Sequence, residues 1–273
     1  RDAGSHTGKP VYGGDWDMRQ LTAFTKKELR ESLRTGRMPL LVILSVLFGI
    51  MNPLVAKLTP WMMENFAGSL EESGMVLTEI KVDVFTSWTQ FYKNTPIYLI
   101  VFIVIASGIL TTEYQKGTLI IILTKGMNRW KLILSKAFSA LLLWTVCYWI
   151  SFGITYAYNM YFWDNSMASH IFFGAFCLYM TGLWLITLIM LMSSLCSTNY
   201  MVLAGTGGVF FVFYLLAWIP DMKKYIPTQL MSSYSLLPQA ADVSDFMCAV
   251  VITGVLSVVN LLLSILIFNK KLL

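Results

Sequence analysis

The stretch that organises this chain is the charged segment at residues 111–138, "TTEYQKGTLIIILTKGMNRWKLILSKAF". It separates two apolar runs, at about 96–112 and 131–161, which approach or exceed the roughly 20 residues that a helix needs to cross a bilayer. Its own apolar strip, Leu119 to Leu123, is far too short to cross. The pattern therefore predicts that this segment lies along the membrane surface between two spans.

The composition is that of a membrane protein. Of 273 residues, 56% are hydrophobic and 13% are charged, whereas soluble domains carry about 25% charged residues. Six apolar runs can be read, at about 39–56, 96–112, 131–161, 171–196, 200–219 and 246–268. Because a spanning segment must satisfy its own backbone hydrogen bonds, we expect an all-α integral membrane protein with six transmembrane helices.

Charge fixes the expected orientation. Counted only after residue 17, and with alternate segments assigned to the inside, the inside segments hold 13 basic residues and three acids, and the outside segments hold five basic residues and nine acids. The positive-inside rule then makes both termini cytoplasmic and places the loop 57–95 outside. Topology and anionic inner-leaflet lipid explain the basic excess, so we predict no nucleic-acid partner.

The N-terminal region divides in two. Residues 1–17 are rich in glycine and contain Gly4-Ser5-His6, which indicates a tag remnant; Gly8-Lys9-Pro10 there lacks the rest of a phosphate-binding loop. Residues 18–38 predict a cytoplasmic amphipathic helix at the inner interface, ahead of the six-span domain 39–273. Its apolar positions recur among basic residues at Leu21, Phe24, Leu29 and Leu33.

The predicted spans contain few residues that could carry out catalysis or bind an ion. Apart from the wetted start of the third run, the six spans lack the ionisable residues that ion-coupled transporters need. They also lack the constellations of an intramembrane enzyme, so we predict no catalytic and no metal site. Cys147, Cys177, Cys196 and Cys248 are interpreted as structural thiols. Asn52, Asn159 and Asn260 are predicted to link helices by hydrogen bonds.

The opening segment can be divided by its local chemistry. Gly117 and Thr118 break the pattern, Leu119 to Thr124 can form a short helix, and Lys125-Gly126 supplies a basic last turn and a stop. Asn128 is placed to cap the next helix. These features predict a short surface helix, which is either an ordinary interfacial loop helix or a contact for a cytosolic partner.

The run "EYQKGTLIIILTKGMNRWKLILSKAF" resembles the signature region of type-2 ATP-binding cassette permeases. That signature has an acid, a Gly-Thr pair, a hydrophobic run, a break and an "SRW"-like entry to the third span. This sequence keeps Glu113, Gly117-Thr118 and Arg129-Trp130, with Gly126 where proline is common and Asn128 where serine is common. The expected topology extends the resemblance over most of residues 18–273.

The resemblance implies a coupling helix after the second span, which docks on a separate ATPase subunit. Glu113 would anchor this segment, Leu119 to Lys125 would make the contact, and the turn Ser197 to Tyr200 would form a second contact. The implied ATPase-contact residues are Glu113, Gly117, Thr118, Leu119, Ile120, Leu123, Lys125, Ser197 and Asn199. Two permeases would pair with two ATPases, and ATP and Mg²⁺ would bind only to the ATPases, so this chain would be no enzyme and hold no cofactor.

These observations predict a homodimeric permease of the cell membrane that exports cargo using a partner's ATP hydrolysis. The chain has 14% aromatic residues and 16 methionines, which favour a hydrophobic or amphipathic cargo such as a peptide, an antibiotic or a lipid-like molecule. Substrate-binding residues cannot be assigned from the sequence. The alternative is a non-transporting scaffold or sensor that binds a cytosolic regulatory protein.

Overall fold

The computed structural model describes residues 13–72, 83–119, 124 and 127–271, with side chains from Arg19 onward except at 62–64 and 66–72. Within these residues the chain is helical and contains no strand. The elements are α1 (Gly13–Arg34), α2 (Arg37–Glu72), α3 (Val84–Gln115), α5 (Arg129–Phe162), η1 (Asn165–Met167), α6 (Ile171–Leu195), α7 (Asn199–Leu216), α8 (Pro220–Lys223), η2 (Pro227–Leu236) and α9 (Ser244–Lys270).

Six of these helices are long and apolar enough to cross a membrane: the first 25 residues of α2, and α3, α5, α6, α7 and α9. The predicted all-α, six-span architecture is thereby confirmed. Apart from its ends, an α-helix pairs its backbone N–H and C=O groups within the segment, which is the condition for lying in hydrocarbon. The chain is a multi-pass membrane protein.

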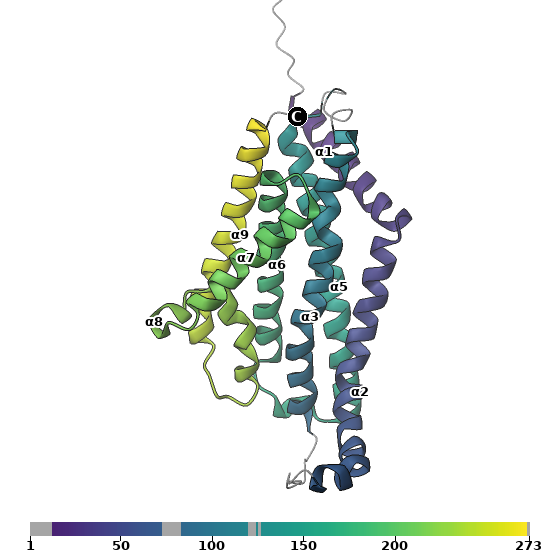
Figure 1. The fold of residues 1–273 in the computed structure, drawn as a ribbon, viewed down its shortest axis with the longest axis vertical. Coiled ribbons are helices and arrows are strands. Elements are labelled where there is room, and N and C mark those ends of the chain that lie inside the picture. The colour runs from purple at the N-terminus through teal and green to yellow at the C-terminus, as the bar shows by residue number, and fades with distance from the viewer. Residues whose placement is uncertain (1–12, 73–82, 120–123, 125–126, 272–273) are drawn as a thin grey trace, which may run out of the picture.

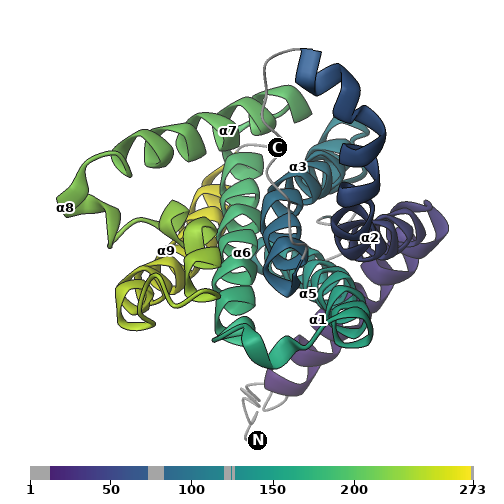
Figure 2. The ribbon, with the colours of Figure 1, turned by 90° about the horizontal axis from the view of Figure 1, so that it is seen from below.

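The spans are arranged around α6, which packs against α3, α5, α7 and α9. Viewed along the bundle, α7 and α8 form one edge, and α1 and α2 lie on the opposite side (Figure 2). The amphipathic helix α1 rests on α5 and on the start of α2. In the side view α7 runs obliquely across the bundle, and α9 ends at the same end of the bundle as α1 (Figure 1).

Aromatic side chains fill the core between α3, α5 and α6. Trp144 on α5 is fully buried, and its ring stacks on Tyr98 of α3 with centroids 5.9 Å apart. Its indole N–H donates to the Tyr179 carbonyl of α6 at 3.3 Å. Gly182 permits this approach, because a Cβ at that position would lie 2.2 Å from the indole.

Polar side chains cross-link the helices, as predicted for the three asparagines. Asn52 of α2 donates to Thr155 of α5 at 3.2 Å, and Asn159 of α5 accepts from Ser87 of α3 at 2.6 Å. Asn260 of α9 donates to α6 at 3.5 Å. Buried polar groups of this kind need partners, since leaving them unpaired in an apolar environment is costly.

Several helices extend beyond the apolar runs of the sequence. α1 begins at Gly13, inside the segment interpreted as a tag remnant, and Gly36 adopts a φ of +75° in the turn to α2. α2 continues to Glu72, and α3 begins at Val84. Much of the predicted external loop 57–95 is therefore helical, and its residues 73–82 lie outside the described part of the chain.

Candidate functional site

The predicted site residues that the structure describes gather at one end of the bundle. This end brings together α1, the end of α3, the start of α5, the α6–α7 turn and the end of α9, and it is uppermost in Figure 1. The connection between α3 and α5 leaves from here. We describe its anchor points in order along the chain.

Glu113, near the end of α3, belongs to a buried ion-pair network. Lys136 of α5 lies 3.0 Å from Glu113 and 2.9 Å from Glu28 of α1, with exposed side-chain fractions of 1% for Lys136, 12% for Glu113 and 9% for Glu28. The Lys136 ammonium also donates to the Ile109 carbonyl at 3.2 Å. Lys136 thus joins α1, α3 and α5 through charged contacts, a role that sequence reasoning missed.

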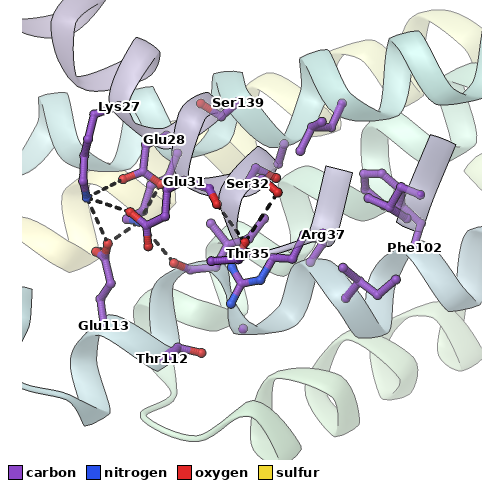
Figure 3. A pocket seen from close by; sticks show the side chains of 18 of the residues that line it. Lys27, Glu28, Glu31, Ser32, Thr35, Arg37, Phe102, Thr112, Glu113 and Ser139 are labelled. Carbon is purple, nitrogen blue, oxygen red and sulfur yellow. Dashed lines mark hydrogen bonds and ion pairs between the residues drawn. The ribbon is translucent and has the colours of Figure 1, made fainter. Parts of the chain in front are cut away.

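The outer edge of this network is formed by Lys27 and Glu31 on α1 (Figure 3). Lys27 lies 3.0 Å from Glu31 and 3.6 Å from Glu113. Partial burial opposes the charged form of Lys27, but the bond to Glu31 and the neighbouring carboxylates outweigh it and raise the Lys27 pKa. Partial burial likewise opposes ionised Glu31, yet the bond to Lys27 and the nearby positive charges lower its pKa.

The three carboxylates of this network could be mistaken for a metal site. Single oxygens of Glu28, Glu31 and Glu113 lie within 4.8 Å of one another. However, Lys27 and Lys136 place ammonium groups against the same three carboxylates. Each of the three carboxylates is therefore ion-paired within the chain, and the cluster is an ion-pair network that holds three helices together.

The segment after α3 turns at Gly117, which has a φ of +67°, a conformation that favours glycine. The Thr118 hydroxyl donates to the Glu113 carbonyl at 3.3 Å. Leu119 is 1% exposed and belongs to an apolar cluster with Leu110 and Phe268. Its side chain therefore holds the segment against the bundle.

The structure describes only part of the predicted coupling segment. Thr118 and Leu119 are helical, and Thr124 is helical and exposed. Ile120, Leu123 and Lys125 lie outside the described residues. The predicted coupling helix thus stays a prediction over most of its length.

The second predicted contact, the turn between α6 and α7, is bonded to the end of α3. The Thr111 hydroxyl donates to the Asn199 side chain, and the Gln115 amide donates to the Ser197 carbonyl at 3.4 Å. Tyr200 follows directly and is 86% exposed. Both predicted contact segments are therefore tied to α3, while Tyr200 projects from the surface.

The start of α5 is fastened to the C-terminus. Arg129 donates to carbonyls at the end of α9, at 3.4 Å to Phe268 and 3.2 Å to Asn269, and to that of the C-cap residue Lys271 at 2.6 Å. A cation is favourable at this end of a helix. Asn128 is the N-cap residue of α5, as predicted, and has the extended backbone of that position, but its side chain makes no capping hydrogen bond. The helix start is held by Arg129 instead.

Comparison with known proteins supports the assignment suggested by this geometry. No curated protein matches the chain. A family model described as "ABC-2 family transporter protein" matches residues 22–273, which include α2 to α9 and most of α1. The matched region contains the signature segment, the six spans and every anchor described above. The chain therefore belongs to the ABC-2 family of transporter proteins.

Proposed function

We propose that this permease is the membrane subunit of an ATP-driven exporter and works with a separate cytosolic ATPase that binds ATP and Mg²⁺. Proteins of the ABC-2 family are membrane subunits that generally work with such a partner. The observation that carries the proposal is the linkage of both predicted contact segments to α3, through Glu113 and Thr118 on one side and Ser197 and Asn199 on the other.

The linkage suggests how a partner could move the spans. A force on the surface near Thr124 or Tyr200 would reach α3 directly, since both segments are fastened there. Lys136 and Glu28 would pass it to α5 and α1. Packed helices respond to such inputs by shifting between discrete arrangements. ATP binding by the partner would therefore change the relative populations of the permease's states.

Homodimer formation and the cargo class are part of the same proposal. The apolar outer faces of α7 and α9 are the least covered of the spans and are available to lipid or to a second copy. We place the pathway between two copies, with two ATPases beneath. The abundant aromatic residues and methionines favour a hydrophobic or amphipathic cargo.

The test is co-purification of the permease with the ATPase encoded beside it, followed by ATP hydrolysis with and without the permease. We expect a complex whose hydrolysis depends on the permease. Gly117→Pro and Ile121→Asp, in the predicted coupling segment, should weaken assembly or hydrolysis. Gly153→Ala, on α5 where the structure leaves open space around the glycine, is the matched control.

Two results would contradict the proposal. If wild type forms no complex with the ATPase, or if both coupling variants behave as the control does, the assigned contact is wrong. A stable complex with a protein that hydrolyses no ATP would instead support the scaffold or sensor alternative.

A further inference from the structure

A cavity of about 340 Å³ lies between α1, α2, α3 and α5, beside the ion-pair network. Its size is at the lower end of the range for pockets that bind small molecules, about 300–1,000 Å³. Figure 3 shows the ion-paired residues Lys27, Glu28, Glu31 and Glu113 at one end of the cavity, Phe102 at the other, and Arg37 between them. The cavity is thus amphipathic along its length.

The lining of the cavity carries a net positive charge, because four cations, Lys27, Arg37, Lys116 and Lys136, face three carboxylates, Glu28, Glu31 and Glu113. Glu28 and Glu113 are bonded to Lys136, and Glu31 is bonded to Lys27. Two further cations line the cavity, Arg37 at the start of α2 and Lys116 just after α3. Within the described part of the chain, the side chains of Arg37 and Lys116 make neither an ion pair nor a hydrogen bond, although the charge of Arg37 contributes to the lowered pKa of Glu31. An anionic group is the complement of this end.

The other end is apolar and lies deeper in the bundle. Phe102 and Ile105 of α3 and Leu143 of α5 line it. Phe102 is separated from Glu113 by eleven residues of α3, about 16 Å of helix. This depth, measured from a cationic mouth near the cytoplasmic ends of the helices, matches an inner-leaflet amphiphile with its head at the surface.

One buried group also points to a missing ligand atom. Ser139 of α5 lines the cavity, is 6% exposed, and its hydroxyl has no hydrogen-bond partner among the described residues. A buried hydroxyl without a partner costs free energy comparable to a lost hydrogen bond. A ligand that enters between the charged mouth and the apolar end would pass this hydroxyl.

We propose that this cavity binds one anionic acyl-chain amphiphile, with its head group at Arg37 and Lys116 and its chain toward Phe102. The site lies within one protomer and does not depend on the proposed ATPase partner. Because its walls include α1 and the residues that Lys136 joins, an occupant would stabilise the docking of α1 on the spans. Membrane phospholipid and free single-chain amphiphiles share this chemistry.

The experiment uses the full-length permease purified in a neutral detergent, without any ATPase. Binding of dodecyl phosphate is measured by native mass spectrometry and by the shift in melting temperature, with dodecanol as the uncharged probe. Nanodiscs containing phosphatidylcholine, with or without phosphatidylglycerol, then distinguish a membrane lipid from a free amphiphile. We expect one dodecyl phosphate per protomer and weaker binding of dodecanol.

Three variants locate the site. The double variant Arg37→Gln/Lys116→Gln should weaken dodecyl phosphate binding about 25-fold, at about fivefold for each cation lost near a membrane surface. Ile105→Trp should block the apolar end while leaving the charges in place. Lys26→Gln/Arg30→Gln removes the same charge from exposed positions of α1 outside the cavity and should leave binding unchanged.

The outcomes separate the site from general surface binding. Equal weakening by the control double variant, or unchanged binding in both cavity variants, would overturn the proposal. Dodecanol binding as tightly as dodecyl phosphate would overturn its anionic part. Retention of phosphatidylglycerol from nanodiscs by wild type, but not by Ile105→Trp, would identify the occupant as a membrane lipid, and binding of dodecyl phosphate alone would identify a free amphiphile.

Discussion

At the scale of single residues, Lys136 has the strongest consequence for stability. Its ammonium is buried between two carboxylates, and removing one partner from a buried ion pair leaves uncompensated charge. We expect Lys136→Met to destabilise the permease by about 3–5 kcal/mol. Unfolding of the purified protein in detergent, followed by circular dichroism, measures the change in free energy.

The matched control is Lys26→Met, which removes an exposed ammonium from the same region and should change the unfolding free energy by less than about 0.5 kcal/mol. The triple variant Lys136→Met/Glu28→Gln/Glu113→Gln should recover part of the loss, since no unpaired charge is then buried. Equal stabilities of Lys136→Met and the control would show that Lys136 is not buried in this network.

The Lys27–Glu31 pair gives a prediction about pH. The folded pKa of Glu31 is lowered, so its contribution to stability is complete above the unfolded pKa and is lost as the pH falls through the folded pKa. The folded pKa of Lys27 is raised, so its contribution to stability is complete below the unfolded pKa and is lost as the pH rises through the folded pKa. The pair therefore stabilises α1 across neutral pH, by at most about 1 kcal/mol because both side chains are nearly half exposed.

Melting temperatures of wild type and Glu31→Gln, measured from neutral to acidic pH, check this expectation. The wild type should be slightly more stable at neutral pH, and the difference should vanish in acid, where Glu31 is itself uncharged. A difference that stays constant over the whole range would mean that the Glu31 carboxylate does not cause it.

The sequence predicted the location of these residues better than their contacts. Lys136 and Glu28 are 108 residues apart, and the sequence pattern predicts each to be a cytoplasmic surface charge. Their contact was not predictable, because periodicity carries no information on which helices pack together. Leu119 belongs to an apolar strip that was interpreted as a partner contact, yet its side chain packs on Leu110 and Phe268. Arg129 matches the family signature at the entry to the third span, but its hydrogen bonds to the end of α9 depend on the tertiary fold.

At the scale of helices, the contact between α5 and α6 depends on Gly182. A Cβ at this position would overlap the buried Trp144 ring, which itself stacks on Tyr98. We expect Gly182→Ala to destabilise the permease by about 1–3 kcal/mol, the usual cost of overpacking a core. Gly153→Ala on α5 meets open space and should be neutral or slightly stabilising, since alanine is the better helix former. Unfolding midpoints that do not separate the two variants would contradict this packing.

The α6–α7 turn offers a test of partner contact without loss of fold. Tyr200 is 86% exposed, so Tyr200→Ala should leave the melting temperature unchanged. If the turn is an ATPase contact, loss of an aromatic anchor should cost about 2 kcal/mol, or about 30-fold in affinity for the ATPase. Tyr161→Ala, 83% exposed on the opposite end of the bundle, is the matched control. Titration of the purified ATPase measures both, and equal affinities would exclude Tyr200 from the contact.

At the scale of the whole molecule, hydropathy predicted the number of spans because each spanning helix must be apolar along about 20 residues. The order in which helices pack was not predictable, since all six present similar apolar surfaces and are distinguished by shape and by a few polar bonds. The central place of α6 follows from such details, including Gly182 against Trp144 and Ser194 bonded to Ser264 at 2.6 Å.

The orientation of the bundle in the membrane is the remaining whole-molecule prediction, and it rests on charge. Basic residues gather at the end that contains Arg129 and Lys136, whereas the opposite end presents the aromatic side chains of Tyr161 and Trp163. Such asymmetry places the basic end in the cytoplasm. Tyr200→Cys and Tyr161→Cys therefore report opposite sides of the membrane.

Both substitutions are made in a variant without native cysteines, and intact cells are treated with a membrane-impermeant thiol reagent. Tyr161→Cys should be labelled in intact cells, and Tyr200→Cys only after the membrane is opened, because charged reagents do not cross the hydrocarbon core. Inside-out vesicles should give the reverse pattern, which controls for the intrinsic reactivity of each site. Labelling of Tyr200→Cys in intact cells would invert the topology, and the two predicted contact segments could not then meet a cytosolic ATPase.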